Sequence, residues 1–496
     1  MPKGALMIQG TASDAGKSLI TAGLCRLFTN RGLRVLPFKP QNMSNNAAIT
    51  ADGGEIGRAQ ALQARACRAD PVSDMNPVLL KPESDKGSQV VVQGQVRASV
   101  SAVDYLSFRY SLMPSVMESF ERLRARADLV LVEGAGSISE INLRDGDISN
   151  MGFAMRAGVP VVLAADIDRG GAIASIVGSW YLLPQGERPM LKGYIMNKFR
   201  GDYSVLAPAV EMIKSECGLQ CFGVLQWFAG ASKFPAEDSL ALASKGLARA
   251  GSGGGRIKIY VLGLSRISNF DDFDPLAAED DVELAYVKPG NAVPGDGDLV
   301  VIPGTKSTIG DLEFLRAQGW DVDIAAHLRR GGRVLGVCGG YQMLGREIAD
   351  PHAVENPEPR TVPGLGLLDV TTVMERGKTL RRFTSLTKQG DEVTGYEIHM
   401  GSTSGPGTEK PMLTLDGVPE GAFSEDRLTF GCYIHGLFTS DSYRTRFLSI
   451  FRGEESRAEG GRYEAQIDAA LDELASHVEK YLNTDELASI AGLNSR

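Results

Sequence analysis

The sequence predicts two α/β domains, each built on a doubly wound, mostly parallel sheet, followed by a helical C-terminal tail. Two observations support this prediction. Short continuous apolar runs alternate with helix-forming stretches in both halves of the chain, which is typical of strands buried on both faces of a parallel sheet. A segment without apolar periodicity, Ser252-Gly-Gly-Gly255, separates the halves. We therefore expect domains at 1–244 and 257–450, a linker at 245–256 and a tail at 451–496.

Seven elements are expected in the first half, where strands and helices alternate as a covered parallel sheet requires. The strands are expected at 5–9, 35–39, 129–133, 159–164 and 193–197, and the helices at 17–28 and 56–68. In the second half, apolar strands are expected at 256–262, 298–303, 333–337 and 428–434. An amphipathic packing helix is predicted in the tail by the spacing of Tyr463, Ile467, Leu471, Leu474 and Val478.

Composition and charge exclude several classes of protein. A net charge of −9 without a basic stripe argues against a nucleic-acid partner. No stretch is apolar enough to span a membrane, and the N-terminus leads directly into the first strand, so we expect a cytoplasmic protein without a signal peptide. Six cysteines in 496 residues do not form a disulfide framework. Cys217 and Cys221 lack a second ligand pair, so no metal site is expected there.

A phosphate-binding loop is predicted at 10–18, between the first strand and the first helix. Five residues separate Gly10 from Gly16-Lys17-Ser18, one more than in the common pattern. Backbone N–H groups are expected to surround the phosphates of ATP, while Lys17 neutralises the transferred phosphoryl group and Ser18 binds Mg²⁺. The ATP-binding residues expected in this loop are Gly10, Thr11, Asp14, Ala15, Gly16, Lys17 and Ser18.

Polar side chains at the ends of later strands are candidates for the same site. Glu133 ends an apolar strand ahead of a glycine-rich turn, a suitable position for a second Mg²⁺ ligand; a helix-capping or surface role is the alternative. Asn197 ends another strand and is a candidate for contact with the ATP base. Asp166 and Asp168 also follow a strand, where aspartates often cap the next helix.

Cys338 is the expected nucleophile of a second reaction. It lies in Gly336-Val-Cys-Gly-Gly340 directly after an apolar strand, and the G-x-C-x-G spacing is typical of a nucleophile elbow. Small neighbours are needed because the turn is strained and the thiol must stand clear of the backbone. The helix N-terminus that follows favours the thiolate, which is the reactive form.

A general base is expected to take the thiol proton and later protonate the leaving ammonia. His435 directly follows an apolar strand and is the preferred candidate, with His399 as its competitor. Gly304 and Gly339 are expected to line an oxyanion hole with their backbone N–H groups. A plain strand–helix turn is the alternative for Gly304.

With these residues placed, the sequence resembles the cobyric acid synthase family along nearly its whole length. The first half is similar to dethiobiotin-synthetase-like domains, whose phosphate loop shares the additional residue. The second half is similar to flavodoxin-like class I glutamine amidotransferases. The stretches that carry the resemblance are Lys39-Pro-Gln-Asn-Met-Ser-Asn-Asn46, Arg266-Ile-Ser-Asn-Phe-Asp-Asp-Phe-Asp-Pro275 and Tyr396-Glu-Ile-His-Met-Gly401.

The resemblance implies that ATP, Mg²⁺ and glutamine are used to amidate the b, d, e and g carboxylates of adenosylcobyrinic acid a,c-diamide. It assigns Cys338 as the glutaminase nucleophile and His435 as its base. It suggests Gln41, Asn42 and Asn45 as substrate residues, and it is compatible with a homo-oligomer. The residues that it assigns to ATP and Mg²⁺ are Lys17, Ser18, Glu133 and Asn197.

One position departs from the wider class I pattern. Class I triads place a glutamate two residues after the histidine, where this chain has Leu437. The cobyric acid branch shares this departure, so the resemblance stands. Glu397 or a backbone carbonyl is the candidate for orienting His435.

Two alternatives remain beside this interpretation. A related amidotransferase, such as cobyrinic acid a,c-diamide synthase or a ligase for a cell-wall lipid, is disfavoured by the stretches at 39–46 and 266–275. A non-catalytic ATPase of the partition type is disfavoured by the elbow at Cys338, which such a protein does not need.

Overall fold

The computed structural model describes residues 3–83, 87–236, 257–355, 358–452 and 462–493, which fall into two compact units. Unit 1 contains residues up to 44, residues 50–235 and residues from 465 onward. Unit 2 contains residues 45–49 and 236–464. The linker expected at 245–256 lies outside the described residues.

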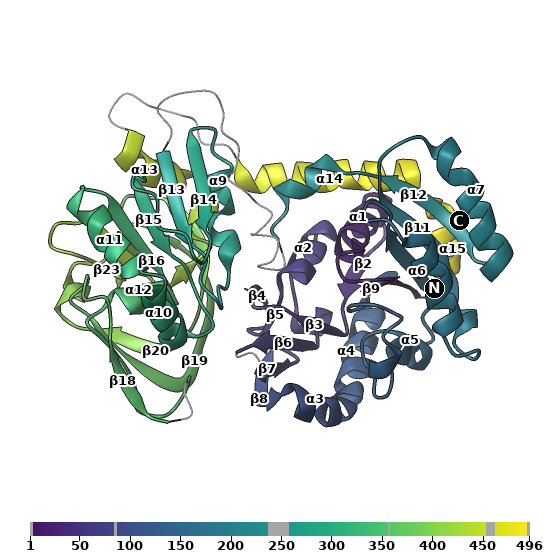
Figure 1. The fold of residues 1–496 in the computed structure, drawn as a ribbon, viewed down its shortest axis with the longest axis horizontal. Coiled ribbons are helices and arrows are strands. Elements are labelled where there is room, and N and C mark those ends of the chain that lie inside the picture. The colour runs from purple at the N-terminus through teal and green to yellow at the C-terminus, as the bar shows by residue number, and fades with distance from the viewer. Residues whose placement is uncertain (1–2, 84–86, 237–256, 356–357, 453–461, 494–496) are drawn as a thin grey trace. The chain divides into compact units, whose positions relative to one another are not determined.

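Unit 1 is built on a six-stranded sheet in the order β12-β11-β10-β1-β9-β2 (Figure 1). All five pairings are parallel, which confirms the predicted α/β class for this half. The strands are short and largely buried because they carry continuous apolar runs. Their bounds are β1 (Gly4–Gly10), β2 (Val35–Phe38), β9 (Leu129–Glu133), β10 (Val161–Asp166), β11 (Leu191–Phe199) and β12 (Gln220–Gln226).

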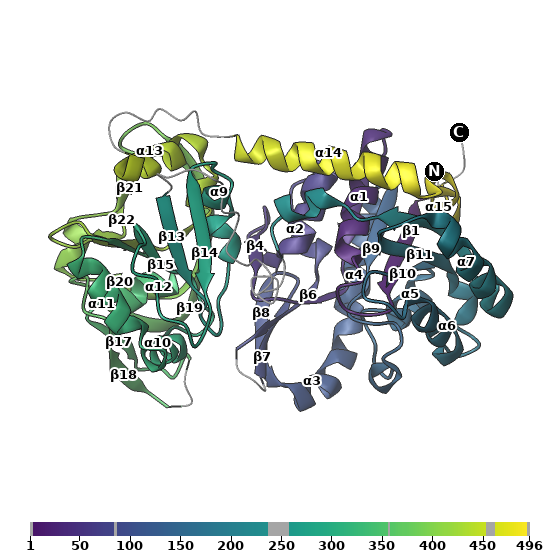
Figure 2. The same cartoon turned by 45° about the horizontal axis from the view of Figure 1, so that its top comes forward.

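Helices cover both faces of this sheet. One face packs against α4 (Met113–Arg126), α5 (Met151–Ala157), α6 (Ala172–Leu182) and α7 (Tyr203–Cys217) in a single apolar core. Figure 2 shows α1 (Lys17–Asn30) and α14 (Tyr463–Tyr481) on the other side of the sheet. A Cβ atom on Gly23 of α1 would lie 2.6 Å from Val478 Cγ2, so glycine permits this close approach. The tail helix therefore packs as its apolar spacing predicts, and α15 (Thr484–Ile490) follows it.

Unit 1 also contains a small sheet that the sequence did not predict. Its order is β3-β6-β7-β8, with strands β3 (Gln41–Met43), β6 (Val78–Pro82), β7 (Gly87–Val92) and β8 (Gln95–Ser101). The helix expected from residue 56 begins two residues later, as α2 (Arg58–Ala66), because β5 (Glu55–Gly57) precedes it. A short helix, α3 (Ala102–Phe108), follows the small sheet.

Unit 2 contains a second six-stranded sheet in the order β14-β13-β15-β16-β24-β23. Four of its pairings are parallel, and only the edge strand β23 runs antiparallel. The doubly wound, mostly parallel fold predicted for this half is thus confirmed. The bounds are β13 (Ile257–Leu262), β14 (Val282–Val287), β15 (Leu299–Ile302), β16 (Arg333–Val337), β23 (Ala422–Phe423) and β24 (Thr429–Cys432).

Two apolar cores cover the faces of this sheet. One contains α10 (Thr308–Ala317), α11 (Trp320–Arg329) and α12 (Gly339–Leu344). The other contains the 3₁₀ turn η6 (Phe270–Phe273), α9 (Asp274–Ala277), the 3₁₀ turn η8 (Leu437–Thr439) and α13 (Asp441–Arg452). Alternate residues of each strand enter opposite cores, so β16 is buried on both sides where it leads to Cys338.

A further sheet of unit 2 lies beside these layers in the order β18-β17-β19-β20-β25. The two-residue strand β25 pairs antiparallel with β20, so that Tyr396 lies opposite His435. The short strand β4 (Ala47–Ile49) also belongs to unit 2. The remaining bounds are β17 (Glu347–Asp350), β18 (Arg360–Pro363), β19 (Thr371–Leu386), β20 (Glu392–Ser404), β21 (Leu413–Leu415), β22 (Val418–Glu420) and β25 (Ile434–His435).

Candidate active sites

The predicted phosphate loop of unit 1 connects β1 to α1 and contains two backbone positions with positive φ. Gly16 has φ 92° as the residue before α1, and Asp14 has φ 55°. Thr11 N donates to Ala164 O of the neighbouring strand over 2.9 Å. Lys17 Nζ donates to Ala12 O over 2.9 Å, which folds the ammonium group back across the loop. A positive charge and the N-terminus of a 14-residue helix thus meet in this loop, a suitable arrangement for phosphate.

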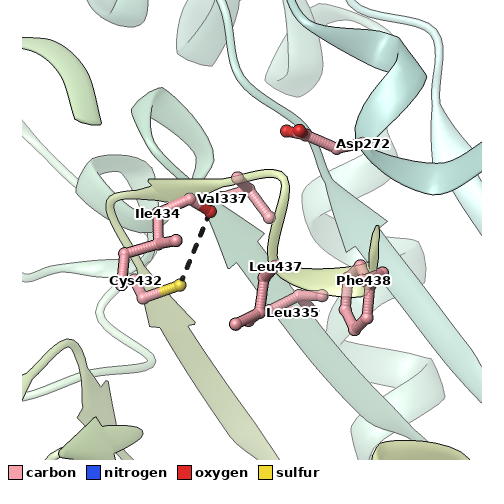
Figure 3. Close-up of a pocket in the computed structure, with 7 residues that line it drawn as sticks. All are labelled: Asp272, Leu335, Val337, Cys432, Ile434, Leu437 and Phe438. Carbon is pink, nitrogen blue, oxygen red and sulfur yellow. Dashed lines mark hydrogen bonds between the residues drawn. The ribbon is translucent and has the colours of Figure 1, made fainter. Parts of the chain in front are cut away.

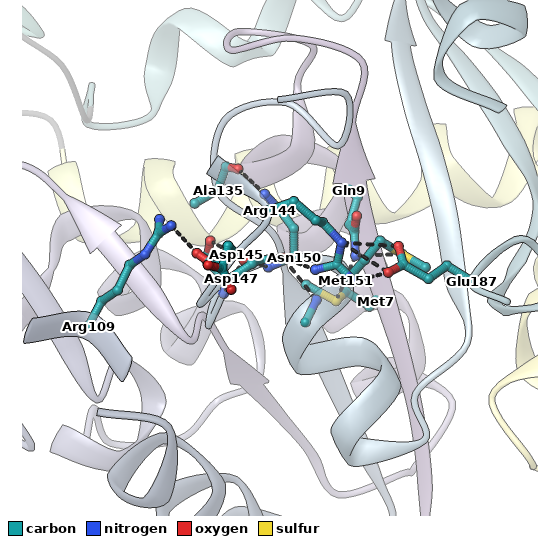
Figure 4. A network of polar contacts seen from close by, with 12 residues as sticks. Met7, Gln9, Arg109, Ala135, Arg144, Asp145, Asp147, Asn150, Met151 and Glu187 are labelled. Carbon is teal, nitrogen blue, oxygen red and sulfur yellow. Dashed lines mark hydrogen bonds and ion pairs between the residues drawn. The ribbon is translucent and has the colours of Figure 1, made fainter. Parts of the chain in front are cut away.

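The glycine-rich turn after β9 closes one side of this loop. Lys17 Nζ donates to Gly136 O over 2.8 Å, and Ser137 Oγ donates to Thr11 O over 2.8 Å. Asn150 holds this glycine-rich turn in place, because its Nδ2 donates to Ala135 O over 2.6 Å (Figure 4). These contacts fix the position of the two segments that would face a bound nucleotide.

Asp147 organises the chain that leads from this turn to α5 (Figure 4). Its Oδ1 accepts from Asn150 N over 2.9 Å, and its Oδ2 accepts from Gly152 N over 2.8 Å. Arg144 Nη1 donates to the same carboxylate over 3.0 Å, while Arg144 Nε donates to Glu187 over 3.0 Å. The network is therefore structural support for the turn.

Glu133, at the end of β9, is buried beside the loop and accepts three side-chain hydrogen bonds. Ser18 Oγ and Lys39 Nζ each donate to its Oε1 over 2.8 Å, and Gln63 Nε2 donates to its Oε2 over 2.5 Å. Burial alone would raise the pKa of Glu133, but the Lys39 ammonium and these hydrogen bonds lower it below its ordinary value. The carboxylate is therefore charged next to the Ser18 hydroxyl.

This pair fits Mg²⁺, which is commonly bound through one or two protein oxygens together with substrate phosphates and water. Ser18 and Glu133 supply one hydroxyl and one carboxylate oxygen within 2.8 Å of each other. The sequence analysis missed Lys39 and Gln63 as parts of this site. Lys39 follows strand β2 directly and begins the 39–46 stretch that carries the family resemblance, but neither feature connected it to Glu133.

Asn197 lies directly behind the phosphate loop. Its Nδ2 donates to Ala15 O over 3.0 Å, and a Cβ atom on Gly16 would lie 2.0 Å from the same nitrogen. Asp166 and Asp168 pair with basic neighbours. Lys198 Nζ bonds to Asp166 Oδ2 over 2.8 Å, and Arg200 lies 3.3 Å from Asp168. These residues surround the loop that the sequence assigned to ATP.

The predicted substrate residues divide between the units. Gln41 and Asn42 lie on β3 of unit 1, whereas Asn45 belongs to unit 2. Tyr105 OH donates to Gln41 Oε1 over 2.6 Å, and Asn42 Nδ2 donates to Gln60 Oε1 over 2.9 Å.

In unit 2, Cys338 connects β16 to α12 in a strained backbone conformation. Its φ is 53° and its ψ is −111°, which few residues with a side chain adopt. A Cβ atom on Gly336 would lie 2.5 Å from Leu344 Cδ1, and one on Gly340 would lie 1.9 Å from Ile302 O. Both flanking glycines are therefore required for the chain to turn here, and the thiol is presented at the end of the strand.

His435 is buried and held by Asp272, a residue that the sequence analysis did not select. His435 Nδ1 lies 2.6 Å from Asp272 Oδ2, and Gly436 N donates to Asp272 Oδ1 over 2.8 Å. Glu397, expected as a candidate for this role, instead lies 3.8 Å from His399. That expectation was wrong because strand β20 directs Glu397 to its neighbour two residues along, on the same face. Among the described residues, no backbone carbonyl is bonded to His435 Nδ1.

The charge state of His435 follows from its neighbours. Burial opposes its protonation, but the Asp272 carboxylate and the Cys338 sulfur outweigh burial and raise the pKa of His435 to about 10. Its Nε2 is buried and has no nitrogen or oxygen partner in the described part of the chain. Cys338 and His435 are thus electrostatically paired, with Nε2 left for proton exchange.

The competing histidine occupies a different environment. The His399 ring stacks on Tyr433 with centroids 3.7 Å apart, and its Nδ1 lies 3.2 Å from Gly401 O. Gln342 Nε2 donates to Tyr433 OH over 3.1 Å, so these side chains form a polar cluster next to the elbow.

The two glycines predicted for the oxyanion hole lie near the same centre. A Cβ atom on Gly304 would lie 3.1 Å from His435 Cε1, and one on Gly339 would lie 2.7 Å from Thr305 Cγ2. Gly339 is the first residue of α12, so its N–H has no partner within that helix. The backbone at both positions can approach a substrate closely because no side chain intervenes.

Replacing His435 by alanine is expected to reduce glutamine-dependent activity by roughly 10²–10⁴-fold, the usual range for a positioned general base. His399→Ala and Leu437→Ala serve as matched comparisons and should cost much less. Ammonia-dependent activity should survive all three changes. Glutamate release, measured by coupled assay, checks the prediction. Loss of glutamine hydrolysis in His399→Ala together with its retention in His435→Ala would reverse the assignment.

Comparisons with known proteins agree with the two-unit organisation. Residues 6–241 match the CobQ/CobB/MinD/ParA nucleotide-binding domain family, and residues 258–443 match the CobB/CobQ-like glutamine amidotransferase domain family. A protein of Bradyrhizobium diazoefficiens named cobyric acid synthase is 57% identical over 98% of this chain and 99% of its own length. The chain belongs to the cobyric acid synthase family.

Other members of the family are similarly close. The cobyric acid synthases of Rhizobium rhizogenes and Rhodobacter capsulatus are each 54% identical over 98% of this chain and 99% of their own lengths. The chain is thus a glutamine-dependent amidating ligase with a nucleotide-binding half, as its sequence predicts. Among the described helices, none combines the length and apolar character needed to cross a lipid bilayer.

Proposed function

We propose that this protein uses ATP and glutamine to amidate the b, d, e and g carboxylates of adenosylcobyrinic acid a,c-diamide. Membership of the cobyric acid synthase family supports this substrate. The observation that carries the proposal is the presence of two different reactive centres in one chain. One is a buried cysteine–histidine pair, and the other is a phosphate loop beside a charged glutamate.

The cysteine centre supplies ammonia. Cys338 passes its proton to His435 Nε2, and the resulting thiolate attacks the carboxamide carbon of glutamine. Backbone N–H groups at Gly304 and Gly339 stabilise the oxyanion that forms. His435 then returns the proton to the departing nitrogen, which leaves as ammonia while a thioester to Cys338 remains. Water hydrolyses the thioester, releasing glutamate and restoring the thiol.

The phosphate loop activates the acceptor. A carboxylate oxygen of the substrate attacks the γ-phosphorus of ATP, which breaks the bond to the β-phosphate oxygen and releases ADP. Lys17 neutralises charge on the transferred phosphoryl group, and Ser18 and Glu133 would hold Mg²⁺. That ion would supply further positive charge to the phosphates when bound. Ammonia opens the acyl phosphate at carbon, giving the amide and inorganic phosphate.

Both centres are required because carboxylate and ammonia do not condense unaided in water. Lys39 adds to the second centre by pairing with Glu133 over 2.8 Å in a buried position. The Lys39 ammonium helps to keep that carboxylate ionised. Gln41, Asn42 and Asn45 are proposed to contact the acceptor.

Incubation with ATP, Mg²⁺, glutamine and adenosylcobyrinic acid a,c-diamide is expected to convert four carboxylates to amides. The product mass, followed over time, checks this result. Cobyrinic acid, which lacks both starting amides, is the matched comparison substrate. Conversion of cobyrinic acid alone to its a,c-diamide would favour the related synthase, and ATP hydrolysis without any amide product would favour a partition-type ATPase that amidates no substrate.

A further inference from the structure

The carboxylate of Asp272 occupies the position at which a third member of a cysteine–histidine centre is expected. It lies 2.6 Å from His435 Nδ1, the ring nitrogen remote from the elbow. An ionised carboxylate only accepts hydrogen bonds, so Nδ1 must carry the proton in this contact. The remaining nitrogen, Nε2, is then available to take the proton of Cys338. The contact therefore selects the reactive tautomer.

Neighbouring residues confine one face and one edge of the His435 ring. Tyr396 stacks on it with centroids 5.1 Å apart and an angle of 18° between the rings. Gly304 lies against its Cε1, where a Cβ atom would come within 3.1 Å. The titratable groups around the ring are Asp272 on η6, Cys338 at the elbow and Tyr396 on β20. Asp272 is thus the one acidic side chain among the described neighbours that bonds directly to the imidazole.

Asp272 is itself fixed on a well-supported turn. It is 5% exposed, and its second oxygen accepts from Gly436 N over 2.8 Å. Asn269, at φ 49°, begins the turn, and Asp272 N donates to Asn269 O over 3.1 Å. The flanking Phe270 and Phe273 are buried in the opposite cores of the sheet. A carboxylate held in this way keeps a constant distance from its partner.

Leu437 stands at the sequence position of the usual class I glutamate. Its side chain lines a mostly apolar cavity of about 10 Å³, whose wall also includes Asp272. Figure 3 shows the Leu437 side chain beside those of Leu335 and Phe438. A carboxylate at this position would be buried among apolar side chains, which is costly for a charged group. Asp272 reaches the imidazole from a different segment, 163 residues earlier in the chain.

We propose that Asp272 is the positioning residue of the glutaminase centre. It takes the role of the class I glutamate, whose position in the sequence is occupied here by Leu437. This inference rests on the proposed roles of Cys338 and His435. Asp272 accepts the Nδ1–H bond and stabilises the imidazolium that forms when Nε2 takes the thiol proton, so the thiolate–imidazolium pair is the resting state from which the reaction starts. The proton moves from sulfur to Nε2 and then to the leaving nitrogen, and Asp272 remains ionised throughout.

The test compares Asp272→Asn with Asp271→Asn, the same change made one residue earlier on the turn. Asp272→Asn is expected to lower kcat/KM for glutamine hydrolysis by about 10³-fold, as loss of an orienting carboxylate does elsewhere. Ammonia-dependent amidation should be retained in both variants. A Cys338→Ala control establishes separately whether Cys338 carries glutamine hydrolysis, so failure of the proposed function is distinguished from failure of this inference.

Alkylation of Cys338 by iodoacetamide, measured against pH, gives a readout that a structural role would not change. In the unsubstituted protein, the imidazolium held by Asp272 lies beside the sulfur and favours the reactive thiolate. In Asp272→Asn, the imidazolium loses its partner, so the pH at which alkylation becomes rapid should be higher than in the unsubstituted protein. Equal pH profiles in the two proteins, together with near-normal glutamine hydrolysis in Asp272→Asn, would overturn the proposal.

A second measurement needs no folded variant at Asp272. The chain has five histidines, so ¹⁵N-histidine labelling gives a small set of ring signals. The signals that disappear in His435→Ala are assigned to His435. We expect both ring nitrogens of His435 to remain protonated at pH 8. A neutral ring at that pH, or a neutral ring protonated at Nε2, would contradict the proposal even if Asp272→Asn did not fold.

Discussion

Replacement of Cys338 by alanine is expected to abolish glutamine-dependent amidation, with a loss on the order of 10⁵-fold or more, as for other catalytic nucleophiles. Without the thiolate, no thioester forms and no ammonia is released from glutamine. Amidation with a high concentration of free ammonia should continue at near the unsubstituted rate, because the phosphate loop and its glutamate are unchanged. Product formation measured in parallel with both nitrogen sources checks this result.

The appropriate control is Cys221→Ala, which removes a half-buried thiol from unit 1. It should leave both activities close to their original values. Circular dichroism of Cys338→Ala then shows whether the fold is retained. A folded Cys338→Ala protein that is inactive with ammonia as well as glutamine would show that Cys338 does not serve the nitrogen-releasing step alone.

The Lys17→Ala variant is expected to lose amidation with either nitrogen source, by on the order of 10³-fold or more, since a charge on the transferred phosphoryl group is no longer neutralised. The prediction follows from the placement of the Lys17 ammonium across the loop, 2.9 Å from Ala12 O and 2.8 Å from Gly136 O. Release of ADP and amide formation are measured together, with glutamine and then with ammonia.

Lys192→Ala is the matched control, because Lys192 is an exposed lysine of the same unit outside the loop. It should behave as the unsubstituted protein does. Glutamine hydrolysis alone should also continue in Lys17→Ala, since the elbow is unchanged. Near-normal amidation in Lys17→Ala would contradict the assignment of the loop to phosphate.

The main sheets could be predicted from the sequence because each strand is a continuous apolar run. The run at 129–133 became β9, and the run at 333–337 became β16. The small sheet β3-β6-β7-β8 was not predicted, since its strands are short and one of them, β8, is mostly exposed and polar. Such strands are specified by pairing with neighbours more than by their own apolar pattern.

The candidate sites divide in the same way. Motifs that are local in sequence, such as the loop at 10–18 and the elbow at Cys338, could be selected from the sequence. In each motif, the residue types and their spacing are those that a single backbone turn requires. Asp272 could not, because its partner His435 lies 163 residues away and no spacing rule connects them. Its only signal was its place in the 266–275 stretch that carried the family resemblance.

Lys39 and Gln63 were missed for a related reason. Each approaches Glu133 from a different element, within 2.8 and 2.5 Å respectively. Three segments that are far apart in sequence meet at the end of β9 only once the sheet is formed. The ends of the strands can be predicted from a single sequence, but the side chains that meet at those ends cannot.

The central claim, that glutamine nitrogen replaces a carboxylate oxygen activated as an acyl phosphate, is tested most directly by a double-label experiment. The protein is given [amide-¹⁵N]glutamine, ATP, Mg²⁺ and adenosylcobyrinic acid a,c-diamide with ¹⁸O in its free carboxylates. We predict ¹⁵N in each new amide and, for each amide formed, one ¹⁸O atom in inorganic phosphate by mass spectrometry. Appearance of ¹⁸O in AMP, or amide formation without ¹⁸O in phosphate, would contradict the account.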